Sequence, residues 1–234
     1  MRLHRFFVQE KIEENINNGT HLTLHSSELL NQLKNVFRLK SGDEVIIFDG
    51  SGKDFTVSIE EFEKDSVRVS VSMSEENKVL PTRETYLFAS LVKKDTFEWI
   101  AEKATELGVS HIVPIMSARS EKKNLNEDRL RKIIIEAAEQ SGRATLPVLH
   151  EISDLETALK NFRHVPSVVW HTNASKFVSQ DVQDSFGAYI GPEGGWSESE
   201  LTLFKKYNMN VRSLGPQILR SETAVIAVIS RLVF

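Results

Sequence analysis

Two short stretches near the C-terminus combine glycine, proline and charged residues at points where an apolar strand gives way to a helix. They read IGPEGGWSESE from Ile190 and LGPQILRSETA from Leu214. Gly194 and Gly195 have no side chain, so a ligand can approach their backbone closely. Glycine and proline also dominate plain tight turns. Two such corners, the second followed by Arg220-Ser-Glu-Thr at the start of an apolar helix, favour a binding site.

The common phosphate, metal and nucleophile motifs do not account for these corners. The first corner lacks the lysine of a P-loop, no G-x-G-x-x-G follows any strand, and H-E-x-x-H does not occur. The seven histidines are scattered, so we predict no metal site. Ser197 lies outside a G-x-S-x-G context and is explained as a helix N-cap. Since the chain has no cysteine, disulfides, thiolate metal sites and a cysteine nucleophile are excluded.

The composition predicts a globular chain without a membrane segment. Of its 234 residues, 40% are hydrophobic and 26% are charged, and the net charge is −4. A negative net charge argues against a broadly basic surface, so any contact with nucleic acid must come from local clusters. No apolar stretch has the length of a signal peptide or of a bilayer span. We therefore expect a cytoplasmic protein.

The first part of the chain is predicted to be a small β-barrel over residues 1–72. Segments rich in Val, Ile, Phe and Thr predict strands at 4–8, 21–25, 43–49, 54–60 and 66–72. One helix is predicted at 26–37, with Ser26 or Ser27 as its N-cap. Residues 73–84 are polar, contain a proline and break the strand pattern, so we predict a linker there.

From residue 85 to 234, apolar strands alternate with helices, which predicts a mostly parallel α/β sheet with helices on both faces. Strands are expected at 85–92, 111–116, 147–152, 167–170 and 187–190, and helices at 95–108, 127–140, 153–162, after Ser197 and at 222–234. Capping boxes are expected at Asp95 with Glu98, Ser153 with Glu156, and Ser197 with Glu200. Both corners then lie at carboxyl ends of strands, where ligands of open α/β sheets bind.

Motifs along the whole chain, in their order and spacing, are similar to those of one known family. Besides the two corners they are RFFV, NVFRLKSGDEVIIFDGSG, EKATELGVSHIVPIMSARS and EAAEQSGR. The chain resembles the SPOUT (α/β-knot) RNA methyltransferases and, among them, the RsmE family, which methylates N3 of a uridine in 16S ribosomal RNA. Two positions depart from the family's usual residues. Gln217 stands where an arginine is usual, and Phe37 where an aliphatic residue is usual.

The resemblance implies a PUA-like RNA-binding barrel followed by an α/β domain with a C-terminal deep trefoil knot. It also implies that S-adenosylmethionine (SAM) binds in the knot and that the site is completed in a homodimer. The residues expected to bind SAM are Trp170, His171, Thr172, Ile190, Gly191, Pro192, Glu193, Gly194, Gly195, Leu214, Gly215, Ile218, Leu219, Thr223 and Ala224.

Methylation of N3 places negative charge on the uracil ring, because N3 must lose its proton. We hypothesise that the permanently cationic Arg220 stabilises that charge. Glu222 is the candidate for accepting the proton or for orienting the arginine. The alternative is that Arg220 is only a structural ion-pair partner of Glu222 or Glu193.

Contacts to RNA phosphates are expected from basic residues spread over both parts of the chain. They are Arg2, Arg5, Arg38, Arg119, Lys122, Lys123 and Arg143. For each of them a solvated surface position is an equally good reading. The expected partner is 16S rRNA in the small ribosomal subunit. Two alternatives remain open: a SPOUT methyltransferase that acts on another RNA position, and a non-catalytic ribosome-assembly factor.

Overall fold

The computed structural model describes residues 3–16, 20–79, 83–120, 124–177 and 185–233, which form two compact units. The first unit comprises Met1–Leu80 together with Ala138–Leu146, and the second comprises Pro81–Ala137 together with Pro147–Phe234. A segment from the second half of the sequence therefore packs with the N-terminal residues. The division at 73–84 drawn from the sequence does not include this segment.

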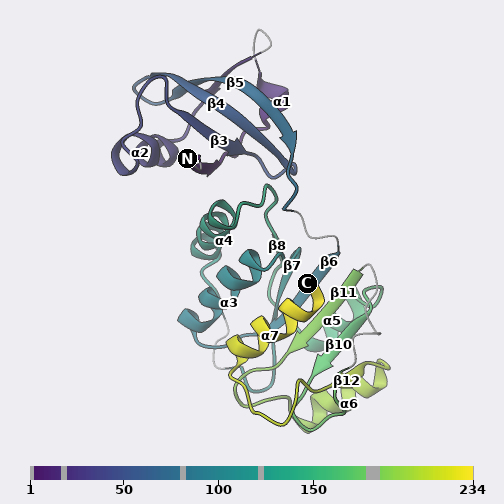
Figure 1. Ribbon diagram of the computed structural model, residues 1–234. Coiled ribbons are helices and arrows are strands. Elements are labelled where there is room, and N and C mark those ends of the chain that lie inside the picture. The colour runs from purple at the N-terminus through teal and green to yellow at the C-terminus, as the bar shows by residue number, and fades with distance from the viewer. Residues whose placement is uncertain (1–2, 17–19, 80–82, 121–123, 178–184, 234) are drawn as a thin grey trace. The chain divides into compact units, whose positions relative to one another are not determined.

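The first unit is built on a five-stranded sheet (Figure 1). Its strands are β1 (Arg5–Phe7), β2 (His21–Leu24), β3 (Glu44–Phe48), β4 (Lys53–Phe62) and β5 (Val67–Glu76), in the order β1-β3-β4-β5-β2. Only the β1–β3 pair is parallel. All five predicted strands are confirmed. β5 is longer than predicted because its last residues pair with the start of β4, where Glu76 lies opposite Lys53.

Three short helices accompany this sheet: α1 (Ile12–Asn15), α2 (Ser27–Asn31) and the π-helix η1 (Gln32–Val36). Ser26 caps α2 by accepting a hydrogen bond from the Leu29 amide, as predicted. The single helix predicted over 26–37 is wrong in its second half, where the winding changes to the wider π form. Arg38 then adopts a positive φ of 55° and ends the helix.

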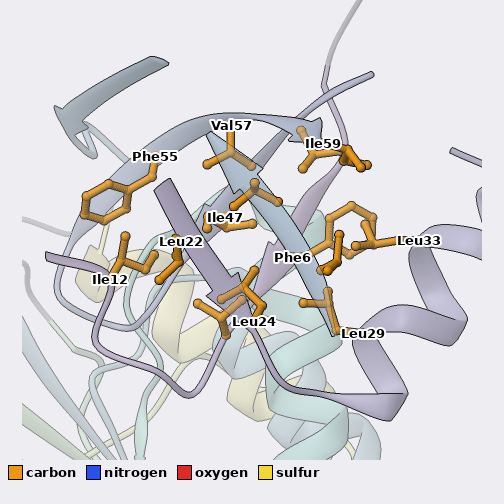
Figure 2. Close-up of a cluster of buried hydrophobic side chains, with 14 residues drawn as sticks. Phe6, Ile12, Leu22, Leu24, Leu29, Leu33, Ile47, Phe55, Val57 and Ile59 are labelled. Atoms are coloured by element: carbon orange, nitrogen blue, oxygen red, sulfur yellow. The ribbon is translucent and has the colours of Figure 1, made fainter. Parts of the chain in front are cut away.

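The core of the first unit is made of aliphatic and aromatic side chains that alternate along the strands. Figure 2 shows this cluster, in which β3 and β4 contribute Ile47, Phe55, Val57 and Ile59. Leu29 and Leu33, from α2 and η1, pack into the same cluster. Because successive strand residues point to opposite faces, the alternating pattern of β4 predicted this buried face.

A buried ion pair lies at the edge of this core. Both guanidinium Nη atoms of Arg5 donate to the carboxylate of Asp54 at 2.7 Å, and only 7% and 11% of the two side chains are exposed. The Arg5 guanidinium also lies 5.2 Å from the centre of the Phe48 ring. Asn77 donates to Asp54 at 2.7 Å and to the carbonyl of Gly142 at 2.9 Å. The ion pair is thereby connected to the segment 138–146.

The second unit is a parallel sheet covered on both faces (Figure 1). Its strands are β6 (Glu84–Ser90), β7 (His111–Met116), β8 (Val148–Leu149), β9 (Ser153–Asp154), β10 (Ser167–Trp170), β11 (Ser185–Ile190) and β12 (Asn210–Arg212). Its helices are α3 (Lys94–Glu106), α5 (Leu155–Asn161), α6 (Glu198–Lys206) and α7 (Ser221–Val233), together with α4 (Glu127–Ser141) up to Ala137. The strand order is β12-β10-β11-β6-β7-β8, with β9 beside β7.

The two faces of this sheet hold different helices. Tyr86 and Phe88 of β6 pack in one cluster with residues of α5 and α6. Leu87 and Ala89 alternate with them and are equally buried. Helices α3 and α7 contact each other, and α7 contacts β6 and β11. The prediction of a parallel sheet with helices on both faces is therefore confirmed, and no described helix is long and apolar enough to cross a membrane.

Of the three predicted capping boxes, one is confirmed and two are wrong. Ser197 and Glu200 form the reciprocal pair as predicted. The box at Asp95 and Glu98 is wrong, because the helix begins at Lys94 and the buried Glu98 instead accepts from Arg129 Nε at 2.8 Å. The box at Ser153 is also wrong, because Ser153 is part of β9 and Asp154 caps α5.

We expect replacement of Asp54 by Ala to destabilise the first unit by about 3–5 kcal/mol, because the Arg5 charge stays buried without its partner. All three tryptophans lie outside this unit, so unfolding should be followed by amide hydrogen exchange of its strands in urea. The exposed pair Lys53–Glu13 provides the control. Lys53→Ala should leave the protection of the same strands unchanged. An equal loss of protection in both variants would contradict the assignment.

Candidate active site

The sheet register brings both glycine-proline corners to one edge of the second unit. Trp170 at the end of β10 lies opposite Ile190 at the end of β11 and opposite Arg212 at the end of β12. The first corner follows β11 and the second follows β12, so the corners lie on either side of β10. The carboxyl ends of these parallel strands lie side by side, and this is the edge of the sheet at which the sequence predicted a ligand site.

Hydrogen bonds fix the corners relative to each other. Ser221, the first residue of α7, donates from Oγ to the carbonyl of Gly191 at 2.9 Å. This bond connects the helix after the second corner to the first corner. Within the second corner, the Gly215 amide donates to Ser213 Oγ at 3.2 Å, and that hydroxyl donates to the Gly215 carbonyl at 3.0 Å.

A cavity of about 330 Å³ lies between the two corners. It is lined by every residue predicted to bind the cofactor except Thr223. Thr223 is exposed, because the α7 residues that face the cavity are Ser221 and Ala224, which lie three positions apart on one side of the helix. Further lining residues that the sequence did not indicate are Arg119, Asn173, Trp196, Ser213, Gln217 and Ser221.

Two glycines of the first corner are required for different reasons. Gly195 has a φ of +68°, and a Cβ atom placed on it would meet no described atom within 4 Å. Its backbone is therefore open to a ligand. A Cβ on Gly191 would lie 3.2 Å from the ring of Trp196. That ring is buried and donates from Nε1 to the carbonyl of Trp170 at 3.2 Å.

Glu200 connects the loop after β7 to the first corner. Its buried carboxylate accepts from the Ala118 amide at 2.8 Å and from the Ser197 amide at 2.7 Å. Next to this contact, Arg119 donates to the carbonyl of Gly194. The sequence identified Glu200 only as a capping residue and Arg119 only as an RNA contact. The contacts of Glu200 with Ala118 and of Arg119 with Gly194 join residues more than 70 positions apart. No local sequence pattern predicts contacts of this kind.

The two predicted catalytic residues flank the cavity and do not line it. Arg220 is exposed and Glu222 is half-buried, on either side of the cavity residue Ser221. Within the described ranges, no carboxylate lies within ion-pair distance of the Arg220 guanidinium. The structural pairing with Glu193 or Glu222 is thus not present, and the cation can meet a ligand.

The predicted RNA contacts occupy different environments. Arg38 and Arg119 are exposed. Arg5 is bound to Asp54, and Arg143 is only 3% exposed and donates to Thr145 Oγ1 at 3.3 Å. Burial lowers the pKa of Arg143 to about 10. A side chain that contacts an RNA phosphate must be exposed, and the side chains of Arg5 and Arg143 are both buried. Arg2, Lys122 and Lys123 lie outside the described residues.

Two family models match successive parts of this chain. Residues 78–233 match the family model described as an RNA methyltransferase domain. Residues 33–72 match the model described as an RNA methyltransferase PUA domain. The first match covers well over half of the chain.

Individual proteins are similar over the full length. The ribosomal RNA small subunit methyltransferase E of Rickettsia conorii is 30% identical, over 99% of this chain and 95% of its own length. The Bacillus subtilis protein of the same name is 29% identical, over 97% and 95%. The crystal structure of the Neisseria gonorrhoeae enzyme of that name, bound to S-adenosyl methionine, has a TM-score of 0.87 at 28% identity and covers 98% of this chain and 96% of that one.

A Legionella pneumophila protein solved with bound SAM is similar to the same extent, with a TM-score of 0.86 at 29% identity over 98% of this chain and 96% of that one. The fold expected from the sequence, a PUA-like barrel followed by a mostly parallel α/β domain, is confirmed by these matches and by the two sheets. Together, the matched domains and the full-length relatives show that this chain belongs to the PUA-containing RNA methyltransferase family that includes the ribosomal RNA small subunit methyltransferases E.

Proposed function

We propose that this protein transfers a methyl group from SAM to N3 of a uridine in the 16S rRNA of the small ribosomal subunit. The observation that carries the proposal is the cavity formed by both glycine-proline corners at one edge of the parallel sheet. The relatives that are named small-subunit rRNA methyltransferases support the substrate. The similar structures with bound SAM support the cofactor.

The residues around the cavity fit SAM in size and in chemistry. A volume of about 330 Å³ lies in the range of small-molecule sites, which are mostly apolar with a few placed polar groups. Ile190 and Leu214 provide apolar walls, and Glu193 and Asn173 provide polar groups. The open backbone at Gly195 allows close approach. When bound, SAM supplies a methyl group on a positively charged sulfur, so no metal is needed for the transfer.

The chain's contribution to the reaction is positioning and charge. Arginine is a permanent cation in proteins, and Arg220 is exposed next to Ser221, which lines the cavity. There it would stabilise the negative charge that spreads over O2 and O4 of the uracil once N3 is deprotonated. Ser221 fixes the backbone next to Arg220 through its bond to Gly191. Glu222, half-buried on the other side of Ser221, is our candidate for the proton acceptor.

The uridine must be unpaired when it reacts, because N3 lies on the edge that forms base pairs. The net charge of −4 leaves few phosphate contacts to hold free RNA. We therefore infer that the structured small subunit is the substrate and that the protein acts in the cytoplasm, where ribosomes are found.

We also propose that the active form is a homodimer. Ile218 is 86% exposed and Leu219 is 36% exposed, although both line the cavity. Apolar side chains exposed at a ligand site indicate that another surface covers them, and a second copy of the chain is our candidate. Sedimentation equilibrium should give twice the chain mass for the wild type. Ile218→Asp should shift the population towards one copy, whereas a wild-type protein of single mass would contradict the proposal.

The function is tested directly with labelled SAM and small subunits from cells that lack the enzyme. We expect the label on N3 of one uridine of 16S rRNA, located by mass spectrometry of nuclease fragments. Large subunits from the same cells serve as the control and should remain unlabelled. SAM binding without transfer would favour a non-catalytic assembly factor, and label at another position would favour a different RNA methyltransferase.

Arg220→Ala should lower the rate of methyl transfer by about 10²–10³, the usual effect of removing one group that stabilises transition-state charge. The affinity for SAM, measured by calorimetry, should stay within about twofold, because Arg220 does not line the cavity. Arg231→Ala, an exposed arginine at the far end of the same helix, should leave both quantities unchanged. Near-normal transfer by the Arg220 variant would remove this residue from the mechanism.

Gly195→Ala should weaken SAM binding by at least about tenfold, because the added methyl group occupies space at the ligand site. The positive φ should also destabilise the fold by about 1 kcal/mol. Gly42→Ala in the first unit is a matched control, since Gly42 has a φ of +93° and an equally open Cβ position. The Gly42→Ala variant should lose stability in the same way but bind SAM with the affinity of the wild type. Equal SAM binding by both variants would show that Gly195 does not face the cofactor.

A further inference from the structure

An aromatic patch lies on the surface of the first unit, at the margin of its core. Phe37 is 38% exposed, and the adjacent Val36 is 61% exposed. The ring of His4 lies 4.5 Å from that of Phe37, tilted by 53°, and the buried ring of Phe6 meets Phe37 edge-on at 5.2 Å. The Phe37 ring is thus in contact with two other rings, and part of it remains exposed to solvent.

The backbone around Phe37 holds the ring in this position. Its amide donates to the carbonyl of Gln32 at 2.9 Å, the five-residue spacing of the π-helix η1. The backbone amide of Leu39 then donates to the backbone carbonyl of Leu33 at 2.9 Å. The side chain of Leu33 is buried in the core cluster that Figure 2 shows. Single π-turns occur frequently at functional sites. Anchoring by the two leucines leaves Phe37 and Arg38 outside the core.

The residues that surround the patch in the sequence are basic. Lys34, Arg38 and Lys40 are all exposed, and no acidic residue occurs between positions 34 and 40. The nearest carboxylate in the sequence, that of Asp43, accepts from the backbone amide of Lys40 at 2.7 Å. Among the described residues, none of the three cations is within ion-pair distance of a carboxylate. In a chain with a net charge of −4, this is a local concentration of free positive charge.

We propose that Phe37, flanked by His4, is a stacking platform for one unpaired base of the RNA substrate, and that Arg38 contacts the adjoining phosphate. Aromatic rings next to free cations are the combination by which proteins hold single-stranded RNA. The free cations favour RNA over an apolar protein partner, which would leave them desolvated and unpaired. The proposal rests on the proposed function, because it assigns a second contact to the same RNA.

The test compares two RNA probes that differ only in their bases. One is a fluorescently labelled 12-nucleotide oligouridylate, and the other is a 12-residue abasic ribose-phosphate chain. Binding to the full chain at low salt is measured by anisotropy. Phe37→Ala should weaken binding of the oligouridylate by about 5- to 150-fold, the range for loss of one stacked base. It should leave binding of the abasic chain unchanged, whereas Arg38→Ala should weaken binding of both probes.

Two further variants separate stacking from folding and from general surface polarity. Phe37→Tyr keeps an aromatic ring and should bind the oligouridylate within about threefold of the wild type. Met73→Ala removes an exposed apolar side chain of the same unit, 50% exposed and without a ring, and should have no effect.

Several results would overturn the platform. These are no measurable binding of oligouridylate by the wild type, equal losses for Phe37→Ala on both probes, or failure of the Tyr variant to retain binding. A change of sedimenting mass in Phe37→Ala would instead assign the patch to contact between copies. Methylation of small subunits by the wild type, measured separately, shows whether the proposed function or only the platform has failed.

Discussion

Parallel pairing of β10 with both β11 and β12 is the constraint on which the site depends. The register places Trp170, Ile190 and Arg212 side by side, so the loops that leave these strands must turn within a few residues of one another. Neither loop could form the cavity alone, since one provides Gly191 to Trp196 and the other provides Ser213 to Gly215 and Gln217 to Leu219. The bond from Ser221 to Gly191 then holds the start of α7 against the first corner. The place of the cavity therefore follows from the strand order.

Much of this arrangement could be predicted from local patterns, and the exceptions share a cause. The alternation of strands and helices, the two corners and the capping box at Ser197 all depend on residues close in sequence. The box predicted at Asp95 failed because Glu98 is drawn to Arg129, some 30 positions later. Arg119 and Glu200 were assigned too small a role because their partners, Gly194 and Ala118, are distant in the chain. Tertiary contacts take precedence over local preference where a charged group is buried.

Buried charge also explains why a short segment of the second half packs with the barrel. Taking Arg5 and Asp54 out of water is unfavourable unless their remaining hydrogen-bonding groups are satisfied. The Asn77 side-chain amide donates to the carboxylate of Asp54 and to the backbone carbonyl of Gly142. Phe7 donates from its backbone to Glu139, and Gly52 donates to Ala144. The family motif that contains Glu139 and Gly142 thus has a structural role within the first unit, in addition to any contact with RNA.

Some charged residues of this chain are buried among several partners and others are exposed without an ion pair, and this difference bears on how an acidic protein can bind RNA. Arg5 and Glu200 are held by several partners in buried positions. Arg38 and Arg220 are exposed, and neither is in an ion pair with a described residue. A cation already bound to a carboxylate gains little from a phosphate, because the first partner must be given up. Arg38 stands next to the aromatic ring of Phe37, and Arg220 stands next to Ser221, which lines the cavity between the two corners. A flexible strand can use such contacts only weakly, whereas RNA that presents its unpaired bases in a fixed geometry, as in a folded ribosomal subunit, is held more tightly.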